Sequence, residues 1–208
     1  MKTDLKVNRK FLLKDYSSNI KLKKDFKNLA FLNQVHGDKI VKVEKLGYAG
    51  KADGLFTKKV DLKLGVRVAD CNAIYLWDEN LNIIMILHAG WKGTVKNILS
   101  KGINIFLEND IASEDINIYI SPSARKCCYE VQEDFIKNLD FKLKNFVVKF
   151  KNKYFFDMLG LNISTAREKG VKNISYADDC TVCSAQYFSY RKNRTEKRHL
   201  AYIEKIRK

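Results

Sequence analysis

Three residues with metal-binding side chains stand in distinct local contexts: His36 in QVHG, Cys71 in ADC and His88 in HAGW. Imidazole and thiolate are ligands that Zn²⁺ prefers, and three protein ligands leave a fourth tetrahedral position open, as in catalytic zinc sites. The spacings of 35 and 17 residues exclude a zinc finger and a His-Glu-x-x-His helix. A zinc site therefore requires the fold to assemble it; ordinary packed core residues are the alternative.

Further polar residues could assist such a site. Asp70 could act as a general acid or base, although sharing a pocket with Cys71 requires a bend, because neighbours in a strand face opposite sides. Lys92 lies in GWKGT at an expected helix start, where backbone N–H groups attract anions; an ordinary turn is equally compatible. Arg191 and Arg198 carry guanidinium groups suited to phosphate or carboxylate, unless they belong to a surface tail.

Two other loops have open interpretations. The segment 121–126 contains Ser123, Arg125 and Lys126 and could hold an anion, but a solvated basic turn is the simpler expectation. Asp53 precedes Gly54 and could be a polar element of the site; we expect a turn there.

The cysteines do not form a disulfide pattern, because five is an odd number. Cys180 and Cys183 form a CxxC motif, but no second CxxC exists, which argues against a zinc ribbon. A redox role is open, and a core or loop position is the simpler expectation. Cys127 and Cys128 could form a vicinal disulfide, whereas buried reduced thiols are the default.

Composition indicates a packed globular protein, with 46% hydrophobic and 12% aromatic residues in a chain of 208. No apolar run is long enough to span a bilayer and the N-terminus does not resemble a secretion signal, so we expect a cytoplasmic protein with no membrane partner. The net charge of +15 arises from 31 lysines and 8 arginines spread along the chain. Without a nucleic-acid motif, attraction of a small anionic substrate is the favoured use of this charge.

The apolar pattern predicts alternating strands and helices in one domain spanning residues 1–208. Residues 29–36 and 39–45 are expected to form a hairpin, and NIIMILH a buried strand ending at His88. Thr94 is the expected N-cap of the following helix. The predicted fold class is mixed α/β (α+β), with a layered mixed sheet flanked by helices. Further strands are expected at 64–77, broken near residues 69–71, at 116–120, at 146–150 and, as the last strand, at 173–178; further helices are expected at 129–139 and 157–170.

Ordered motifs across residues 28–203 resemble the YfiH/YlmD family: QVHG, ADG, ADC, HAGWKGT, CCYEV, FFD, CTVC, FSYR and Arg198. These proteins are also called laccase-domain or multicopper polyphenol oxidase-like, and are now described as purine nucleoside phosphorylases. The resemblance implies a YfiH-like layered fold and metal ligands at His36, Cys71 and His88. This sequence departs from the family in its N-terminal ~27 residues, which are shortened. Its SPSARKCCYEV loop lacks two glycines and a proline, and EKR replaces TGR.

The activities implied are zinc-dependent phosphorolysis of adenosine, inosine or methylthioadenosine, and deamination of adenosine. In that scheme Cys71, His88 and Asp70 are catalytic, while Lys92, Arg191 and Arg198 hold phosphate. The alternative is a peptidoglycan-editing amide hydrolase that removes L-Ser from UDP-MurNAc-L-Ser, with Cys71 as nucleophile. A non-enzymatic binding protein is a third class. A copper polyphenol oxidase is disfavoured because it needs about ten histidines and the chain has three.

Overall fold

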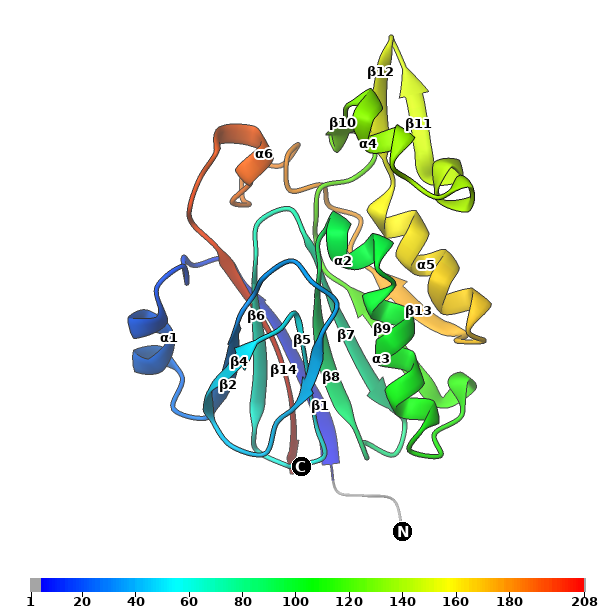
Figure 1. The fold of residues 1–208 in the computed structure, drawn as a ribbon. Coiled ribbons are helices and arrows are strands. Elements are labelled where there is room, and N and C mark those ends of the chain that lie inside the picture. The colour runs from blue at the N-terminus through cyan, green and yellow to red at the C-terminus, as the bar shows by residue number, and fades with distance from the viewer. Residues whose placement is uncertain (1–4, 208) are drawn as a thin grey trace.

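The computed structural model describes residues 5–207 and places two large β-sheets face to face (Figure 1). The first sheet has the strand order β1 (Leu5–Leu12), β14 (His199–Arg207), β6 (Lys63–Val68), β2 (Leu29–Asn33), β4 (Gly47–Lys51). The second has the order β13 (Asn173–Tyr176), β9 (Ile116–Ile120), β7 (Asn72–Asp78), β8 (Ile84–Ala89), β5 (Gly54–Thr57), β3 (Ile40–Lys42). Both combine parallel and antiparallel pairs, which confirms the predicted mixed α/β class.

Hydrophobic cores lie on both sides of the second sheet, one against the first sheet and one against the helices, because strands β7 and β8 are apolar on both faces. Alternate residues of a strand face opposite sides. In β8, Ile84 and Ile86 therefore pack against the first sheet, while Met85 and Leu87 pack toward the helices. Burial on both faces explains the continuous apolar run that the sequence shows before His88.

Helices cover the outer faces of the two sheets. The outer face of the second sheet packs against α3 (Ile98–Leu107) and α5 (Met158–Glu168), and α2 (Trp91–Val95) precedes α3 (Figure 1). On the first sheet, α1 (Asn19–Asp25) buries Leu22 against Leu29 and Leu200. Within residues 5–207, no helix is long and apolar enough to cross a membrane.

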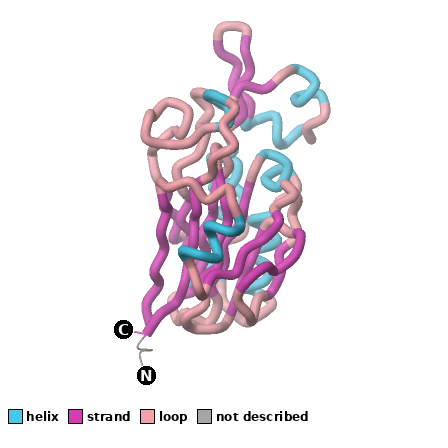
Figure 2. Tube along the Cα trace, turned by 90° about the vertical axis from the view of Figure 1, so that its left-hand side faces the viewer, coloured by secondary structure: helices cyan, strands magenta, loops and turns pink. Residues whose placement is uncertain are grey.

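A small third sheet projects at one end of the molecule, next to long loops (Figures 1 and 2). Its strand order is β10 (Glu130–Val131), β12 (Lys153–Phe156), β11 (Val147–Phe150). It carries α4 (Glu133–Lys137), and the 3₁₀ turn Phe141–Phe146 leads into β11. The short helix α6 (Tyr190–Asn193) lies at the same end, which is where the site described below is built.

Two predictions about strands are wrong. The segments 29–36 and 39–45 do not form a hairpin, because β2 pairs with β4 and β6 in the first sheet, whereas β3 pairs with β5 in the second. The last strand is not 173–178 but β14, which lies between β1 and β6 and is buried from His199 to Lys205. Its partners are far away in sequence, so a local pattern could not identify them.

Two helix predictions need correction as well. Helix α2 already begins at Trp91 after Gly90, so Thr94 is a buried helical residue rather than an N-cap. The helix expected over 129–139 is reduced to α4, because Glu130–Val131 instead pair with β12. The helix expected over 157–170 is present as α5, with Asp157 accepting from the Gly160 N–H.

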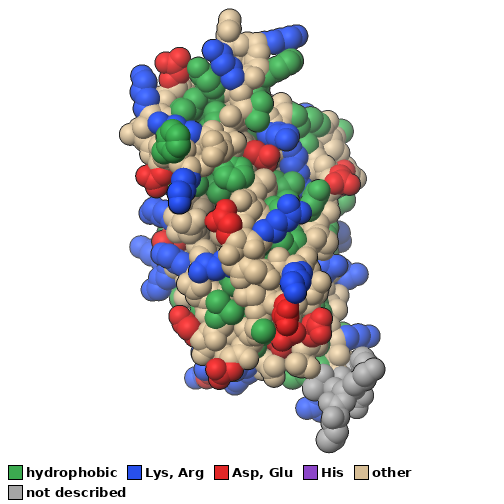
Figure 3. Space-filling model, turned by 90° about the vertical axis from the view of Figure 1, so that its right-hand side faces the viewer, with side chains coloured by type: hydrophobic (Ala, Val, Ile, Leu, Met, Phe, Trp, Pro, Cys, Tyr) green, Lys and Arg blue, Asp and Glu red, His purple; other side chains and the backbone are tan. Residues whose placement is uncertain are grey.

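On one face of the molecule, the positive charge is distributed rather than gathered. On the face shown in Figure 3, lysine and arginine side chains are spread from one end of the molecule to the other, with acidic side chains among them. This distribution agrees with the interpretation of the net charge of +15 as a diffuse field.

Candidate functional site

His36, Cys71 and His88 come together, as the zinc hypothesis requires. One ligand atom from each lies within 4.8 Å of the others. The rings of His36 and His88 are 4.8 Å apart between centroids and inclined at 76°. His88 is buried, Cys71 is half-buried and His36 is exposed, so the cluster has a closed side and an open side.

Each ligand is positioned by the end of a strand. His88 follows the β8 face that carries Ile84 and Ile86, so it points between the sheets. Cys71 lies in the link between β6 and β7, directly after Asp70, whose φ of 83° is left-handed. That conformation is the bend the sequence argument required. His36 follows β2 and is itself left-handed, with φ 57°.

Asp53 lies at the candidate site, which agrees with the polar site element that the sequence left open beside the expected turn. It is fully buried, and its Oδ1 lies 2.8 Å from Nδ1 of His88. The same carboxylate accepts the backbone N–H groups of His36 at 3.0 Å and Gly37 at 2.7 Å. It therefore fixes the His88 ring, leaves Nε2 for a ligand and holds the loop that carries His36. These hydrogen bonds and His88 lower the pKa of Asp53 despite its burial.

Gly90 leaves the space that the sulfur occupies. A Cβ at this position would lie 2.9 Å from Sγ of Cys71 and 3.2 Å from Cδ2 of His36. Its φ of −74° is accessible to any residue, so the requirement for glycine is steric and local to the three-residue cluster.

The protonation of the cluster favours a thiolate. Burial alone raises the pKa of Cys71, but the adjacent His88 and His36 more than offset this and bring it to about 6. Burial lowers the pKa of His88, whereas the Cys71 sulfur and the Asp53 carboxylate raise it to about 9. Thiolate is both the nucleophilic and the metal-binding form of cysteine, so this environment suits either role.

The cluster opens into a cavity of about 1020 Å³. Four arginines line it, whereas no lysine does among the described residues; the four are Arg67, Arg191, Arg194 and Arg198. Aromatic side chains also line it: Trp91, Tyr129 and Tyr190. The combination can recognise a flat ring and an anion at once.

The predicted phosphate residues separate into two groups. Arg191 and Arg198 line the cavity as expected. The Arg191 guanidinium carbon lies 3.4 Å from the centre of the Tyr129 ring, and Nη1 donates to the Glu130 carbonyl at 2.7 Å. Lys92 is exposed and is not among the lining residues of the described chain; its Nζ lies 5.5 Å from the centre of the Trp91 ring.

Asp70 is buried at the edge of the same cavity. Its Oδ1 accepts the Thr181 hydroxyl and its Oδ2 accepts the Arg191 backbone N–H, each at 2.7 Å. Its carbonyl accepts the Ala124 N–H at 2.9 Å. Asp70 therefore joins three segments of the chain beside Cys71.

The segment 121–126 is neither an open anion cradle nor a solvated turn. The Arg125 side chain is buried and donates to Oγ of Ser123 at 2.7 Å, and to the carbonyls of Ser121 and Ala177. Only Lys126 is solvated, 3.7 Å from Asp157. Arg125 thus ties this loop to the segment after β13.

The sequence analysis missed Arg67, Arg194 and the aromatic lining. One available signal was the scarcity of arginine: half of the 8 arginines line this cavity, whereas none of the lysines in the described part of the chain does. A guanidinium binds phosphate or carboxylate through two parallel hydrogen bonds, which an ammonium cannot do, so an arginine in a lysine-rich chain is informative.

Comparisons with known proteins agree with this architecture. The family model of the multi-copper polyphenol oxidoreductase laccase matches residues 4–205. A protein of Aquifex aeolicus named purine nucleoside phosphorylase is 33% identical over 171 residues, covering 82% of this chain and 79% of its own.

Two solved structures have the same fold. YlmD from Geobacillus stearothermophilus superimposes with a TM-score of 0.79 and 26% identity, covering 89% of this chain and 78% of its own. YfiH from Bacillus licheniformis gives a TM-score of 0.78 and 26% identity, covering 89% and 79%. The layered sheets and the strand ends that carry the cluster therefore belong to a fold that these proteins share.

Proposed function

This chain belongs to the YfiH/YlmD family, and on that premise we propose that it is a zinc-dependent enzyme of purine nucleosides. The proposed reactions are phosphorolysis of adenosine, inosine or methylthioadenosine, and deamination of adenosine. The observation that carries the proposal is the convergence of His36, Cys71 and His88 at a cavity lined by arginine and aromatic side chains.

The donor set fits zinc. One thiolate and two imidazoles are borderline-soft ligands, Asp53 orients His88 from behind, and Gly90 leaves room for the sulfur of Cys71. When bound there, zinc would supply a Lewis acid that lowers the pKa of water or polarises a phosphate oxygen. With three protein ligands, a fourth coordination position would remain for water or phosphate.

Arginines are proposed to bind phosphate in this cavity. Arg194 and Arg198 reach the lining from the segment around α6, and Arg67 reaches it from β6. Guanidinium groups hold phosphate through charge-assisted hydrogen bonds. This proposal moves the anion-binding role from Lys92 to the arginines, because Lys92 is absent from the described lining.

Trp91 is proposed to stack on the purine. It lines the cavity, remains 37% exposed and directly follows Gly90 beside the metal cluster. Its other contact, an edge-to-face packing on Phe135 with centroids 5.2 Å apart, orients the indole. Tyr190, 44% exposed, offers a second aromatic surface.

Asp70 is the proposed proton carrier. In phosphorolysis, a phosphate oxygen forms a bond to C1′ of ribose, the C1′–N bond breaks, and the purine leaves with its electron pair and accepts a proton. In deamination, water adds at C6 and ammonia leaves with a proton. A carboxyl group at the cavity edge can deliver that proton, and the Thr181 and Arg191 contacts fix its orientation.

One observation favours a second candidate, an amide hydrolase. A Cys71 pKa of about 6 beside a His88 pKa of about 9 describes a thiolate–imidazolium pair, as in cysteine hydrolases. In that reaction the sulfur attacks an amide carbonyl, the C–N bond breaks, and His88 gives its proton to the leaving amine; water then cleaves the resulting thioester and releases the carboxylic acid. Iodoacetamide would trap Cys71 in metal-free protein, and hydrolysis would persist without zinc.

Product analysis tests the main proposal. Zinc-loaded protein is incubated with adenosine, with and without phosphate, and the products are separated by chromatography. We expect adenine and ribose 1-phosphate only when phosphate is present, and inosine in either case. His88→Ala should abolish both reactions, while Lys172→Gln, an exposed change beside Glu114, should leave them intact. No conversion of any purine nucleoside by zinc-loaded protein would overturn the proposal.

A further inference from the structure

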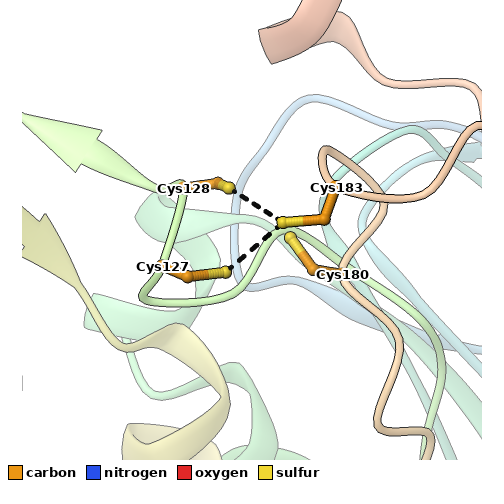
Figure 4. A group of neighbouring side chains, drawn as sticks. All are labelled: Cys127, Cys128, Cys180 and Cys183. Carbon is orange, nitrogen blue, oxygen red and sulfur yellow. Dashed lines mark hydrogen bonds between the residues drawn. The ribbon is translucent and has the colours of Figure 1, made fainter.

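A second group of metal-ligating side chains lies outside the site described above. Cys127 and Cys128 come from the loop between β9 and β10, and Cys180 and Cys183 from the segment between β13 and α6 (Figure 4). The four sulfur atoms point toward one another, although about fifty residues separate the two pairs. None of these cysteines is in a disulfide.

The sulfur atoms have the spacing of a tetrahedral site. Zinc–sulfur bonds of about 2.3 Å place the corners of a regular tetrahedron about 3.8 Å apart. Sγ of Cys183 lies 3.8 Å from that of Cys127 and 3.3 Å from that of Cys128. All four sulfurs fall within 4.8 Å of one another. Small adjustments of the side chains would complete the tetrahedron.

Each cysteine pair sits in a tight backbone turn. The Cys128 N–H donates to the Arg125 carbonyl at 2.9 Å, and the Ser184 N–H donates to the Cys180 carbonyl at 3.1 Å. These turns direct the thiols of each pair toward the other segment, and thiolate is the form of cysteine that binds metal.

The two turns are already aligned before any ligand is considered. Ser123 forms an isolated β-bridge with Cys180, and its carbonyl accepts the Thr181 N–H at 3.1 Å. Arg125 links the same two segments through the Ala177 carbonyl. The backbone contacts at the end of the second sheet therefore hold the two cysteine segments together, whether or not a metal is bound.

We propose that Cys127, Cys128, Cys180 and Cys183 bind one structural Zn²⁺ ion, separate from the His36–Cys71–His88 centre. A soft, four-thiolate donor set in tetrahedral spacing is typical of structural zinc. The absence of a second CxxC motif in the sequence is no obstacle, because the adjacent pair Cys127–Cys128 supplies the other half. This inference stands apart from the proposed function.

The proposed ion would cross-link two walls of the cavity. Cys128, Tyr129 and Val182 line the cavity directly, and Arg191 follows eight residues after Cys183. The segment between β13 and α6 contains no helix or strand, and the Thr181 N–H and the Ala177 carbonyl hold it to the loop before β10. A four-ligand metal would limit its motion and fix the position of the arginines.

Metal stoichiometry tests the proposal. The full chain is loaded with zinc, freed of excess by gel filtration and measured by mass spectrometry of the metal. We expect about two zinc ions per chain for the unchanged protein, and about one for either Cys183→Ser or His88→Ala. The variant that combines Cys183→Ser with His88→Ala should bind about no zinc. Ala185→Ser, which adds a hydroxyl to the same segment and keeps every thiol, should retain about two.

Cobalt substitution gives a readout independent of stoichiometry. Co²⁺ bound by four thiolates absorbs far more strongly in the near ultraviolet than Co²⁺ bound by one. We expect that strong absorption in His88→Ala, and its loss in Cys183→Ser. If Cys183→Ser fails to fold, the spectrum of His88→Ala alone shows whether four thiolates bind Co²⁺.

Several results would overturn the proposal. One zinc ion in the unchanged chain and none in His88→Ala would leave the four cysteines without metal. Iron in place of zinc after expression with both metals available would refute the assignment of the ion. Cysteines that resist alkylation until a reductant is added, with no zinc released, would identify a disulfide instead.

Discussion

The carboxylate of Asp53 lies 2.8 Å from Nδ1 of His88, and both side chains are buried. Asp53 also accepts the backbone N–H groups of Val35, His36 and Gly37. One carboxylate therefore orients one ligand through its ring and another through its main chain. It links the two sheets at the point where the candidate metal centre is assembled.

Asp53→Asn should weaken zinc binding at this centre by about 10- to 100-fold, the usual cost of losing an acidic partner behind a histidine ligand. The amide cannot accept all of the hydrogen bonds that the carboxylate accepts. Competition with a chromophoric chelator measures the affinity. Asp38→Asn removes a neighbouring acid that pairs with Lys101 and should leave the affinity unchanged. Equal zinc affinities for Asp53→Asn and Asp38→Asn would show that Asp53 does not support the metal ligands.

Gly90→Ala should reduce metal occupancy without unfolding the protein. The added methyl group would lie 2.9 Å from Sγ of Cys71, while the backbone conformation at Gly90 suits alanine. Gly102→Ala is the matched control, since its methyl group would meet Sδ of Met85 at 2.9 Å in the core. That variant should lower the melting temperature and keep the metal. Full metal occupancy in Gly90→Ala, with loss of metal in Gly102→Ala, would contradict the steric role of Gly90.

Arg194→Ala should raise the KM for phosphate by at least about tenfold, because one charge-assisted hydrogen bond contributes about 1.5–3 kcal/mol. The KM for the nucleoside should change less. Lys92→Ala should leave the phosphate dependence unaltered, because Lys92 is exposed and absent from the described cavity lining. Steady-state kinetics at varied phosphate distinguishes the two. A larger effect at Lys92 would restore the role that the sequence suggested.

Asp70→Asn should lower kcat by about 10²- to 10⁴-fold, the range for loss of a general acid or base. Asparagine tolerates the left-handed φ of 83° and can keep one of the two 2.7 Å contacts. The KM should change little. Thr181→Val removes one orienting hydrogen bond and should have a smaller effect. An unchanged kcat in Asp70→Asn would assign Asp70 a purely structural role.

His199 should make the fold sensitive to acid. It is buried, its Nε2 accepts the Phe188 N–H at 2.8 Å, and burial lowers its pKa below the ordinary 6.5. Below pH 6.5 the unfolded chain binds a proton that the folded chain does not, so the free energy of unfolding falls as the pH decreases. Above that value His199 contributes no pH dependence.

Urea unfolding between about pH 5.5 and 8 measures this effect on zinc-loaded protein. The difference in free energy of unfolding between the unchanged chain and His199→Gln isolates the contribution of His199, because the other titrating groups are common to both proteins. We expect the two free energies to converge as the pH falls. A difference in free energy of unfolding that stays constant across this pH range would show that His199 does not cause the acid sensitivity.

The three members of the candidate metal cluster could be named from the sequence, and the structure brings them together. A buried strand that ends in a histidine places that side chain at a sheet edge, and the left-handed residue before Cys71 is the bend that the spacing required. The mixed α/β class followed from the alternation of strand and helix patterns. These features depend on residues close together in the chain, where periodicity and side-chain chemistry carry the information.

Only the tertiary structure decided which distant segments meet. The pairing of β14 with β1 and β6, the contact between Asp53 and His88, and the meeting of Cys127–Cys128 with Cys180–Cys183 all join segments far apart in sequence. A local pattern specifies which face of an element is apolar but not which element covers it. The partner is selected by the packing and hydrogen bonding of the whole fold, and that selection turned an expected turn residue and two unremarkable cysteine pairs into candidate parts of metal sites.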